Sequence, residues 1–331
     1  VAGLTTKGLA PIAAVMDTWR KQRAIPDTLN VAMMRLLPKT DQGMANLGKT
    51  RPIALMEHIT KVYEHIIIGR IVEAVGIYKI FDSGQSAGLP KSDTMPPLRI
   101  MVEVLEDARL TEQELHVFVA DLSKAFDSLE YWSQAMSWRA LGMPEGVIRL
   151  LINLDAGKGG GPWESNDANQ HAGATTKVFT AGRHATKPAK HGRGVRQGSV
   201  GGPIKWIAFM NMWIKWVKRE MAGSGYAMHA SVTDDEDGEG PRDTGTTRVG
   251  SGIRSNDPER RAEIISQMFV DDSMWFANDG RDMERMIRMH EKFCGFHKIY
   301  LNKQKCDYMV INARQDYQVT WGEAQAVDEN A

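Results

Sequence analysis

Two adjacent aspartates, Asp271 and Asp272, interrupt one of the most apolar stretches of the chain, which reads QMFVDDSMWF over residues 267–276. Such a segment tends to be buried, and a buried carboxylate is costly unless another group compensates its charge. Strand-like residues flank the pair, so we predict that the aspartates occupy the tight turn of a β-hairpin. Asp-rich turns are common, but this one lacks the Gly or Asn that positive φ favours. A strained turn that presents two anions at one spot favours a divalent cation such as Mg²⁺.

A third carboxylate is expected from another strand of the same sheet. Asp121 ends the apolar run HVFVAD, residues 116–121. Taken alone, it would be a strand-end residue that caps a turn. The stretch GVRQGSVGGP, residues 194–203, joins a basic loop to an apolar segment, and its glycines allow a substrate to approach the backbone closely. Without a cation between them, neighbouring carboxylates should repel, and at least one should have a raised pKa.

The remaining pattern predicts an α+β fold with a mainly antiparallel sheet, because helices and strands interleave without a repeating βαβ unit. Helical spacing of apolar residues predicts helices over 59–72, 97–110, 131–141 and 281–293. Residues 204–217 predict a buried helix, since they are too few and too often interrupted to span a membrane. Strands are predicted over 31–37, 116–121, 263–270, 273–277 and 306–312. Residues 155–173 and 222–258 are poor in apolar side chains and predict inserted loops.

The charges of the chain are segregated, although the formal net charge is +0. Residues 1–70 hold ten Lys and Arg against five acidic residues, and residues 183–196 add five more cations with no acid. The stretch 231–243 holds six acidic residues and one Arg, so an acidic loop offsets much of the basic surface. The two cysteines, Cys294 and Cys306, lack the spacing of a zinc site or a disulfide framework, which favours an intracellular, reducing compartment.

Several segments, in order, resemble the motifs of reverse transcriptases, most closely those of non-LTR retrotransposons. The palm motifs are matched by FVADLSKAFDS, GVRQGSVGGP, FVDD and GFHKIYLNKQKCDYMVIN. The finger motifs are matched by LLPKT, KTRPIALMEHITKVYEHIIIGRI and GQSAGLPKS. The ordered set is far more specific than any one of its members. It implies a right-hand polymerase with fingers and palm, a mainly antiparallel palm sheet flanked by helices, and a thumb that is largely absent.

The resemblance also implies roles for individual residues. Asp121, Asp271 and Asp272 match the metal-binding triad of a two-metal mechanism, with two Mg²⁺ ions and Mn²⁺ as a substitute. Nucleotide contacts are implied for Lys39 and Arg51 at the triphosphate, Gln197 beside the sugar, and Phe126 as the gate that excludes a ribose 2′-OH. Lys305 matches a possible general acid, although an exposed strand Lys is an equal alternative. Template or primer contacts are implied for Arg196, Gly198 and Gln85.

The implied activity is RNA-directed DNA polymerisation, in which dNTPs are added to a primer 3′-OH. Phe126, Gln197 and Val270 stand where RNA-dependent RNA polymerases usually carry other residues, which favours DNA synthesis. Two alternatives stay open, namely a group II intron or other prokaryotic-type enzyme and a catalytically inactive palm that serves as an RNA-binding scaffold. The expected partners are an RNA template, a DNA primer or nicked target DNA, dNTPs and further domains of a parent polyprotein, with no membrane.

The expected domain division follows the motifs. Residues 1–115 hold the fingers and the start of the palm, residues 116–312 the palm with its two inserted loops, and residues 313–331 a tail that leads toward a missing thumb. The chain opens without an initiator Met or a targeting signal, which predicts a piece of a longer protein. A nuclear location is expected if the source is a eukaryotic retrotransposon.

Overall fold

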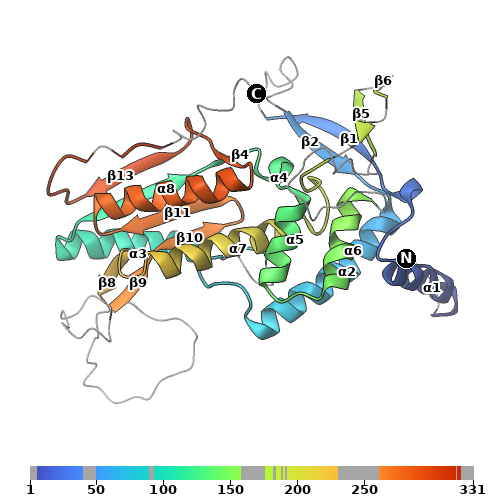
Figure 1. Ribbon diagram of the computed structural model, residues 1–331, viewed down its shortest axis with the longest axis horizontal. Helices are drawn as coiled ribbons and strands as arrows, with labels where there is room; N and C mark the ends of the chain where they lie inside the picture. Colours follow the sequence, from blue (N-terminus) through green and yellow to red (C-terminus); the bar gives the residue numbers. More distant parts are fainter. Residues whose placement is uncertain are drawn as a thin grey trace.

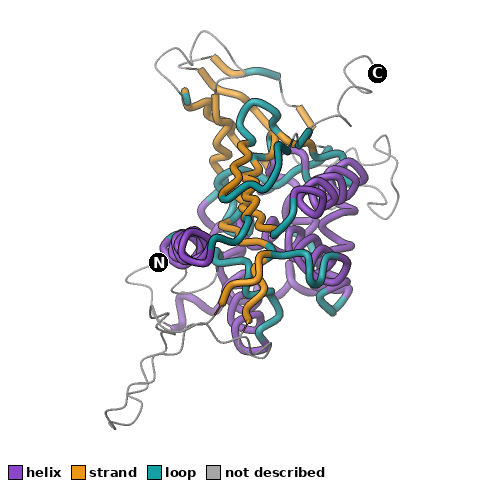
Figure 2. Tube along the Cα trace, turned by 90° about the vertical axis from the view of Figure 1, so that its left-hand side faces the viewer, coloured by secondary structure: helices purple, strands orange, loops and turns teal. Residues whose placement is uncertain are grey.

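The computed structural model describes residues 6–39, 50–88, 93–157, 176–181, 184–187, 189–190, 192–229, 261–317 and 319–321. The molecule is elongated, with one sheet and its helices at one end and a second sheet at the other (Figure 1). Viewed after a quarter turn, most of the helices lie to one side of the strands (Figure 2). The predicted α+β class is confirmed.

The first sheet is antiparallel throughout, with strand order β10-β11-β3-β13. Its members are β3 (Leu115–Ala120), β10 (Ser266–Phe269), β11 (Asp272–Ala277) and β13 (Asp307–Ile311). Side chains alternate between the two faces. Val117 and Phe276 pack in a cluster with α3 (Met95–Thr111), whereas Phe118 and Trp275 pack on the other face in a cluster with α7 (Gly202–Glu220) and α8 (Gly280–Phe296). Helices therefore flank the sheet on both sides.

The single strand predicted over residues 263–270 is wrong, because the chain changes sheets there. Its first half is β9 (Arg261–Ile264), which pairs with β8 (Tyr226–His229), and its second half is β10. Ile265 lies between the two strands, and its carbonyl accepts a hydrogen bond from the Phe276 N–H at 2.9 Å. The loop predicted over 222–258 therefore begins too early, because β8 lies within it and pairs with β9. Residues 230–258, with the acidic loop 231–243, lie outside the described residues.

The second sheet lies at the opposite end of the molecule from the first sheet (Figure 1). In it, β1 (Val31–Pro38) pairs antiparallel with β2 (Thr50–Leu55) and parallel with β5 (Thr176–Ala181). Two short strands, β6 (His184–Ala185) and β7 (Ala189–Lys190), also pair with β5. A separate pair, β4 (Leu122–Ser123) and β12 (Tyr300–Leu301), lies next to the first sheet. Of these strands, only β1 was predicted from the sequence.

Helix α7 is buried along most of its length and joins two apolar clusters. Ile204 and Ala208 belong to the cluster of α2 (His58–Tyr78), α5 (Tyr131–Ala140) and α6 (Glu145–Ala156). Trp206 and Trp213 belong to the cluster of the first sheet and α8. The predicted buried helix is confirmed, as are those that became α2, α3, α5 and α8. The sequence did not predict α1 (Thr6–Gln22), the short helices η1 (Asp27–Leu29) and α4 (Ala125–Ser128), or α6.

The loop predicted over 155–173 begins too early. Asp155 and Ala156 are buried residues in the last turn of α6, and residues 158–173 lie outside the described residues. Both cysteines are buried free thiols. Within the described ranges, no helix is long and apolar enough to cross a membrane.

Candidate active site

Three aspartates meet at one end of the antiparallel sheet. Asp121 directly follows β3, and Asp271 and Asp272 lie where β10 turns into β11. Ser273 of β11 is paired with Ala120 of β3, so Asp272 and Asp121 occupy the next position of the same strand pair. The sheet register thereby brings together two residues that are 151 positions apart in the sequence (272 − 121).

The turn between β10 and β11 has only two residues, Val270 and Asp271, because Phe269 pairs with Asp272. Both aspartates were predicted in the turn, but Asp272 is the first residue of β11. Val270, the first of the two, has φ +61°. A β-branched residue rarely adopts this left-handed conformation, which costs roughly 1–3 kcal/mol and persists only when surrounding contacts hold it. The strained turn expected from the absence of Gly and Asn is therefore present.

Two buried side chains hold the backbone of Val270. The indole N–H of Trp206 donates to the Val270 carbonyl at 3.0 Å, and the Val270 N–H donates to Oε1 of Gln85 at 3.3 Å. The segment around Gln85 is fixed in turn against β10, because Met268 N–H donates to Gly84 O at 2.7 Å and Ser86 N–H donates to Met268 O at 3.0 Å. Sequence reasoning missed Trp206, whose only signal was its place in the apolar helix.

The electrostatics of the three aspartates fit an uncompensated anionic cluster. Burial raises the pKa of the Asp271 carboxyl above its ordinary value, and the charges of Asp272 and Asp121 raise it further. The expected increase for at least one carboxyl is confirmed. Lys305 brings a cation close to the cluster, since its Nζ lies 3.6 Å from Oδ2 of Asp121, and its side chain is 66% exposed. Across the described ranges, no three His, Cys, Asp or Glu side chains are arranged to hold a metal ion.

The turn after β12 holds the backbone of Asp121 through contacts to its carbonyl oxygen. The Asp121 carbonyl accepts a hydrogen bond from the Asn302 N–H at 2.8 Å, and the Cys306 Sγ lies 3.7 Å from the same oxygen. The N–H groups of Lys305 and Cys306 donate to Asn302 O at 2.9 and 3.1 Å, which closes this turn. The same short segment therefore fixes the Asp121 backbone and carries the Lys305 ammonium.

The residues expected beside the nucleotide lie on two adjoining segments. Phe126 is partly buried and stacks on Trp206, with ring centroids 5.6 Å apart. Gln197 donates from Nε2 to Oδ2 of Asp127 at 2.9 Å. Gly194 has φ +87°, and an added Cβ would lie 2.5 Å from the Asp127 carbonyl oxygen, so only glycine allows this close approach. The loop that holds Gln197 is thus fitted directly against the segment that follows β4.

The basic residues expected to hold the triphosphate belong to the β1–β2 hairpin. Lys39 follows β1 and is exposed, and Arg51 lies opposite Leu37 on β2 and is also exposed. The hairpin is linked to the Gln197 loop, because the Ala54 N–H donates to Gln197 O at 2.7 Å. Gly198 is exposed with φ +102°, and an added Cβ would lie 2.9 Å from Ala54 O. The nucleotide and template roles of these residues stay predictions.

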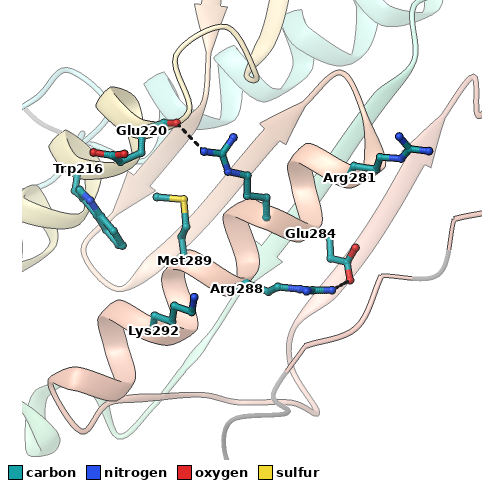
Figure 3. A pocket seen from close by; sticks show the side chains of 8 residues that line it. Trp216, Glu220, Arg281, Glu284, Arg288, Met289 and Lys292 are labelled. Carbon is teal, nitrogen blue, oxygen red and sulfur yellow. Dashed lines mark hydrogen bonds and ion pairs between the residues drawn. The ribbon is translucent and has the colours of Figure 1, made fainter.

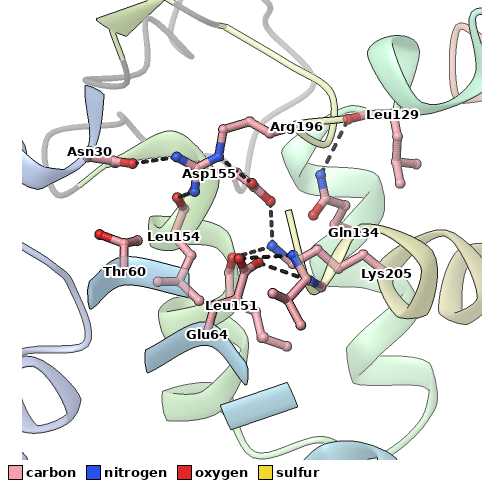
Figure 4. Close-up of polar contacts among 12 residues, drawn as sticks. Asn30, Thr60, Glu64, Leu129, Gln134, Leu151, Leu154, Asp155, Arg196 and Lys205 are labelled. Atoms are coloured by element: carbon pink, nitrogen blue, oxygen red, sulfur yellow. Dashed lines mark hydrogen bonds and ion pairs between the residues drawn. The ribbon is translucent and has the colours of Figure 1, made fainter. Parts of the chain in front are cut away.

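The template contacts predicted for Arg196 and Gln85 need correction, since both side chains are buried, at 1% and 5% exposure. Arg196 Nε lies 3.3 Å from Oδ1 of Asp155, its Nη1 donates to Asn30 Oδ1 at 3.0 Å, and its Nη2 donates to the Leu154 carbonyl (Figure 4). Its guanidinium is therefore used inside the protein. Gln85 supports the Val270 turn. The amide Nε2 of Gln85 has no hydrogen-bond partner within the described ranges.

Asp155 joins Arg196 to a second buried cation. Lys205 of α7 is 0% exposed, and its Nζ lies 2.5 Å from Asp155 Oδ2 and 3.1 Å from the Leu151 carbonyl. A buried ammonium needs such a partner. The Lys in the apolar sequence of α7 was a signal that a buried acid exists, although it did not indicate which one.

Glu64 of α2 anchors the start of α7, another role that the sequence did not reveal. Its carboxylate accepts hydrogen bonds from the N–H groups of Val200 and Gly201, each at 3.1 Å (Figure 4). An anion at a helix N-terminus satisfies free N–H groups and interacts favourably with the helix dipole. An added Cβ at Gly201 would lie 3.0 Å from Glu64 Oε1, so a glycine leaves room for the carboxylate.

Comparison of the chain with known proteins finds relatives among retrotransposon proteins. Pol polyproteins of R2 retrotransposable elements are similar to the chain. The protein from Bradysia coprophila is 23% identical over 130 residues, which are 39% of this chain and 14% of that protein. The R2DM protein of Drosophila melanogaster is 22% identical over 302 residues, which are 91% of this chain and 23% of that protein. The chain thus spans less than a quarter of these curated relatives.

Two solved structures share the fold. Truncated apo telomerase of Candida tropicalis has a TM-score of 0.52 at 9% identity, over 93% of this chain and 56% of that one. Telomerase of the same organism in complex with a telomeric RNA fragment has a TM-score of 0.54 at 9% identity, over 96% of this chain and 47% of that one. The family described as "Reverse transcriptase (RNA-dependent DNA polymerase)" matches residues 37–323. The chain therefore belongs to the reverse transcriptase family.

Proposed function

We propose that this chain is the polymerising part of a non-LTR retrotransposon protein and adds dNTPs to a primer 3′-OH on an RNA template. The observation that carries the proposal is the meeting of Asp121, Asp271 and Asp272 at one end of the sheet, in a chain of the reverse transcriptase family. The similarity to R2 polyproteins supports the retrotransposon assignment over a prokaryotic-type enzyme. An RNA template, a DNA primer or nicked target DNA, and further domains of the polyprotein are the proposed partners.

The family generally uses divalent metal ions, and the donor set fits Mg²⁺. Hard cations prefer carboxylate oxygens and substrate phosphates, and the pKa of Asp271 is raised by burial and by the charges of Asp272 and Asp121. Asp121, Asp271 and Asp272 would hold two Mg²⁺ ions, or Mn²⁺ as a substitute. Bound there, magnesium would favour ionisation of the primer 3′-OH and offset the negative charge of the triphosphate. Because three like charges repel, we propose that the carboxylates close around the metal only when it binds.

The surrounding residues have distinct proposed tasks. Trp206 and Gln85 hold the Val270 turn, which positions the two aspartates that follow it. The exposed Lys39 and Arg51 bind the triphosphate, and Gln197 contacts the sugar. Phe126, packed against Trp206, occupies the space that a ribose 2′-OH would need. Lys305, beside Asp121, donates a proton to the departing pyrophosphate.

Primer extension tests the proposal. A DNA primer on an RNA template is incubated with the chain, Mg²⁺ and dNTPs, and the Asp271→Asn variant is the matched control because it removes the charge and keeps the shape. We expect incorporation by the unaltered chain and near-complete loss in the variant. If the unaltered chain, also when joined to its flanking sequence, incorporates no more than the variant, the activity is absent and an RNA-binding scaffold is the better reading.

The sugar gate has a separate test. Phe126→Ala opens the space beside Trp206, so the ratio of ribonucleotide to dNTP incorporation should rise. Phe126→Tyr keeps the aromatic bulk and should leave that ratio low. An unchanged ratio in the Ala variant removes Phe126 from its assigned role, whatever happens to the overall rate.

A further inference from the structure

A groove of about 460 Å³ lies between the end of α7 and the exposed side of α8 (Figure 3). We call it the α8 groove and define it by Trp216 of α7 and by five residues of α8, namely Arg281, Arg285, Arg288, Met289 and Lys292. Trp216 faces Met289 across the groove (Figure 3). The indole ring of Trp216 also packs on Trp213 and Phe293, with centroids 5.8 and 6.2 Å apart, so the core holds the ring in place.

The cations of the α8 groove form a stripe along one side of the helix. Arg281, Arg285, Arg288 and Lys292 are spaced by four, three and four residues, which places them on one helical face. With a rise of about 1.5 Å per residue, the stripe extends roughly 17 Å. All four residues are exposed.

Acidic side chains compensate only part of this charge. Glu284 pairs with Arg288, while the Glu220 carboxylate pairs at 2.8 Å with Arg219, which lies outside the groove. Among the described residues, Arg285 has no acidic side-chain partner, and its Nη2 donates to the Glu220 carbonyl oxygen at 3.5 Å. Arg281 and Lys292 have no acidic side-chain partner in the part of the chain that the structure describes. Glu220 and Glu284 also line the groove, so four cations stand against two acidic residues and the lining keeps a net positive charge.

The α8 groove lies on the opposite face of the sheet from the proposed polymerase site. Phe118 and Ala120 pack in the same cluster as Met283 and Met286 of α8. Because side chains alternate along a strand, Asp121 and Asp272 point toward the other face. A strand bound in the α8 groove would therefore leave the polymerase site free.

We propose that the α8 groove binds a single nucleic-acid strand through its phosphates, with Trp216 as a surface on which a base stacks. The guanidinium group of arginine can donate two hydrogen bonds to phosphate oxygens. Proteins that bind single strands usually combine a basic groove with aromatic rings on which bases stack. An acidic peptide would use the same cations but would gain less from the aromatic ring. The inference goes beyond the proposed function, because it assigns nucleic-acid binding to a surface to which the proposed polymerase site contributes no residue.

The test measures binding without nucleotides or metal, so its result does not depend on polymerase activity. Labelled single-stranded RNA of about 12 nucleotides, and DNA of the same sequence, are titrated with the full 331-residue chain at several salt concentrations. The variant Arg281→Gln/Lys292→Gln removes two of the cations that lack an acidic partner. The control Arg139→Gln/Arg149→Gln removes the same charge from α5 and α6, away from the groove.

We expect the groove variant to lower the slope of log affinity against log salt by about 1.4, because each phosphate contact to a single strand contributes about 0.7. The control should keep the original slope. Ultraviolet crosslinking should attach the strand to the α8 peptide in the unaltered chain. An equal effect on RNA and DNA supports recognition of the phosphates alone, and a larger effect on RNA supports a template or element RNA as the ligand. A groove variant whose slope matches the control overturns the proposal.

Discussion

Asp155 forms ion pairs with two buried cations, so its neutralisation should have a large effect. Asp155 and Lys205 are each 0% exposed, and Arg196 is 1% exposed. Asp155→Asn keeps the volume but leaves the ammonium of Lys205 and the guanidinium of Arg196 without their carboxylate. Breaking a buried ion pair from one side costs about 3–5 kcal/mol. The free energy of unfolding of a whole domain is about 5–15 kcal/mol, so we expect the variant to lose a large part of its stability.

The assay is urea unfolding followed by circular dichroism, with Lys205→Met as the matched variant. Replacement of the ammonium by an apolar chain leaves the Arg196–Asp155 pair intact, so Lys205→Met should destabilise less than Asp155→Asn. Combining the two changes removes one of the uncompensated charges, and the double variant should be more stable than Asp155→Asn alone. A loss below about 1 kcal/mol for Asp155→Asn would refute the reasoning, because it would mean that water reaches these charges.

Three further outcomes follow from other contacts. Trp206→Phe keeps an aromatic side chain, although a smaller one, and removes the N–H that binds the Val270 carbonyl. We expect dNTP incorporation to fall about tenfold, as for a lost buried hydrogen bond of roughly 1–2 kcal/mol, with unchanged secondary structure. An unaltered rate would contradict this. Burial lowers the pKa of His290 to about 3 and that of His297 to about 4. Both side chains therefore bind a proton more readily in the unfolded chain than in the folded one. Their contribution to the free energy of unfolding is present above the ordinary histidine pKa and is lost as the pH falls below it. The free energy of unfolding, measured with urea, should fall by roughly 2–3 kcal/mol between about pH 7.5 and pH 5.5. A free energy of unfolding that does not change with pH would show that the two buried imidazoles are not held in the neutral form. Gly194→Ala should cost about 1–3 kcal/mol in the same assay, because φ is +87° there, and a stability equal to that of the unaltered chain would show that the loop can move away.

The sequence predicted those parts of the fold whose periodicity is strong. The spacing of apolar residues located α3, α7 and α8 to within a few residues, whereas α2 continues six residues beyond its predicted end at residue 72 (78 − 72). Residues 263–270 form two strands instead of one, because side-chain alternation cannot show that the backbone leaves one sheet for another at Ile265. α6 was not predicted, and its last turn was assigned to a loop because Gly and Asn follow it closely.

At the site, the sequence predicted which carboxylates meet but not what holds them. Ordered motifs brought Asp121 together with Asp271 and Asp272, and the register of the sheet agrees. The supporting contacts of Trp206 and the inward direction of Arg196 depend on tertiary packing. A polar residue in a motif can bind a ligand or can bond to buried groups of the protein, and the sequence alone does not distinguish the two.

Helix α7 supplies side chains to both apolar clusters, and this has a consequence for how the molecule unfolds. Ile204 packs with α2, α5 and α6, while Trp213 packs with the first sheet and α8. Loss of either cluster would expose one side of this buried helix to water and weaken the other cluster. The two apolar clusters are therefore coupled in stability, and a change in the cluster of α2, α5 and α6 can alter the packing of the first sheet that carries the aspartates.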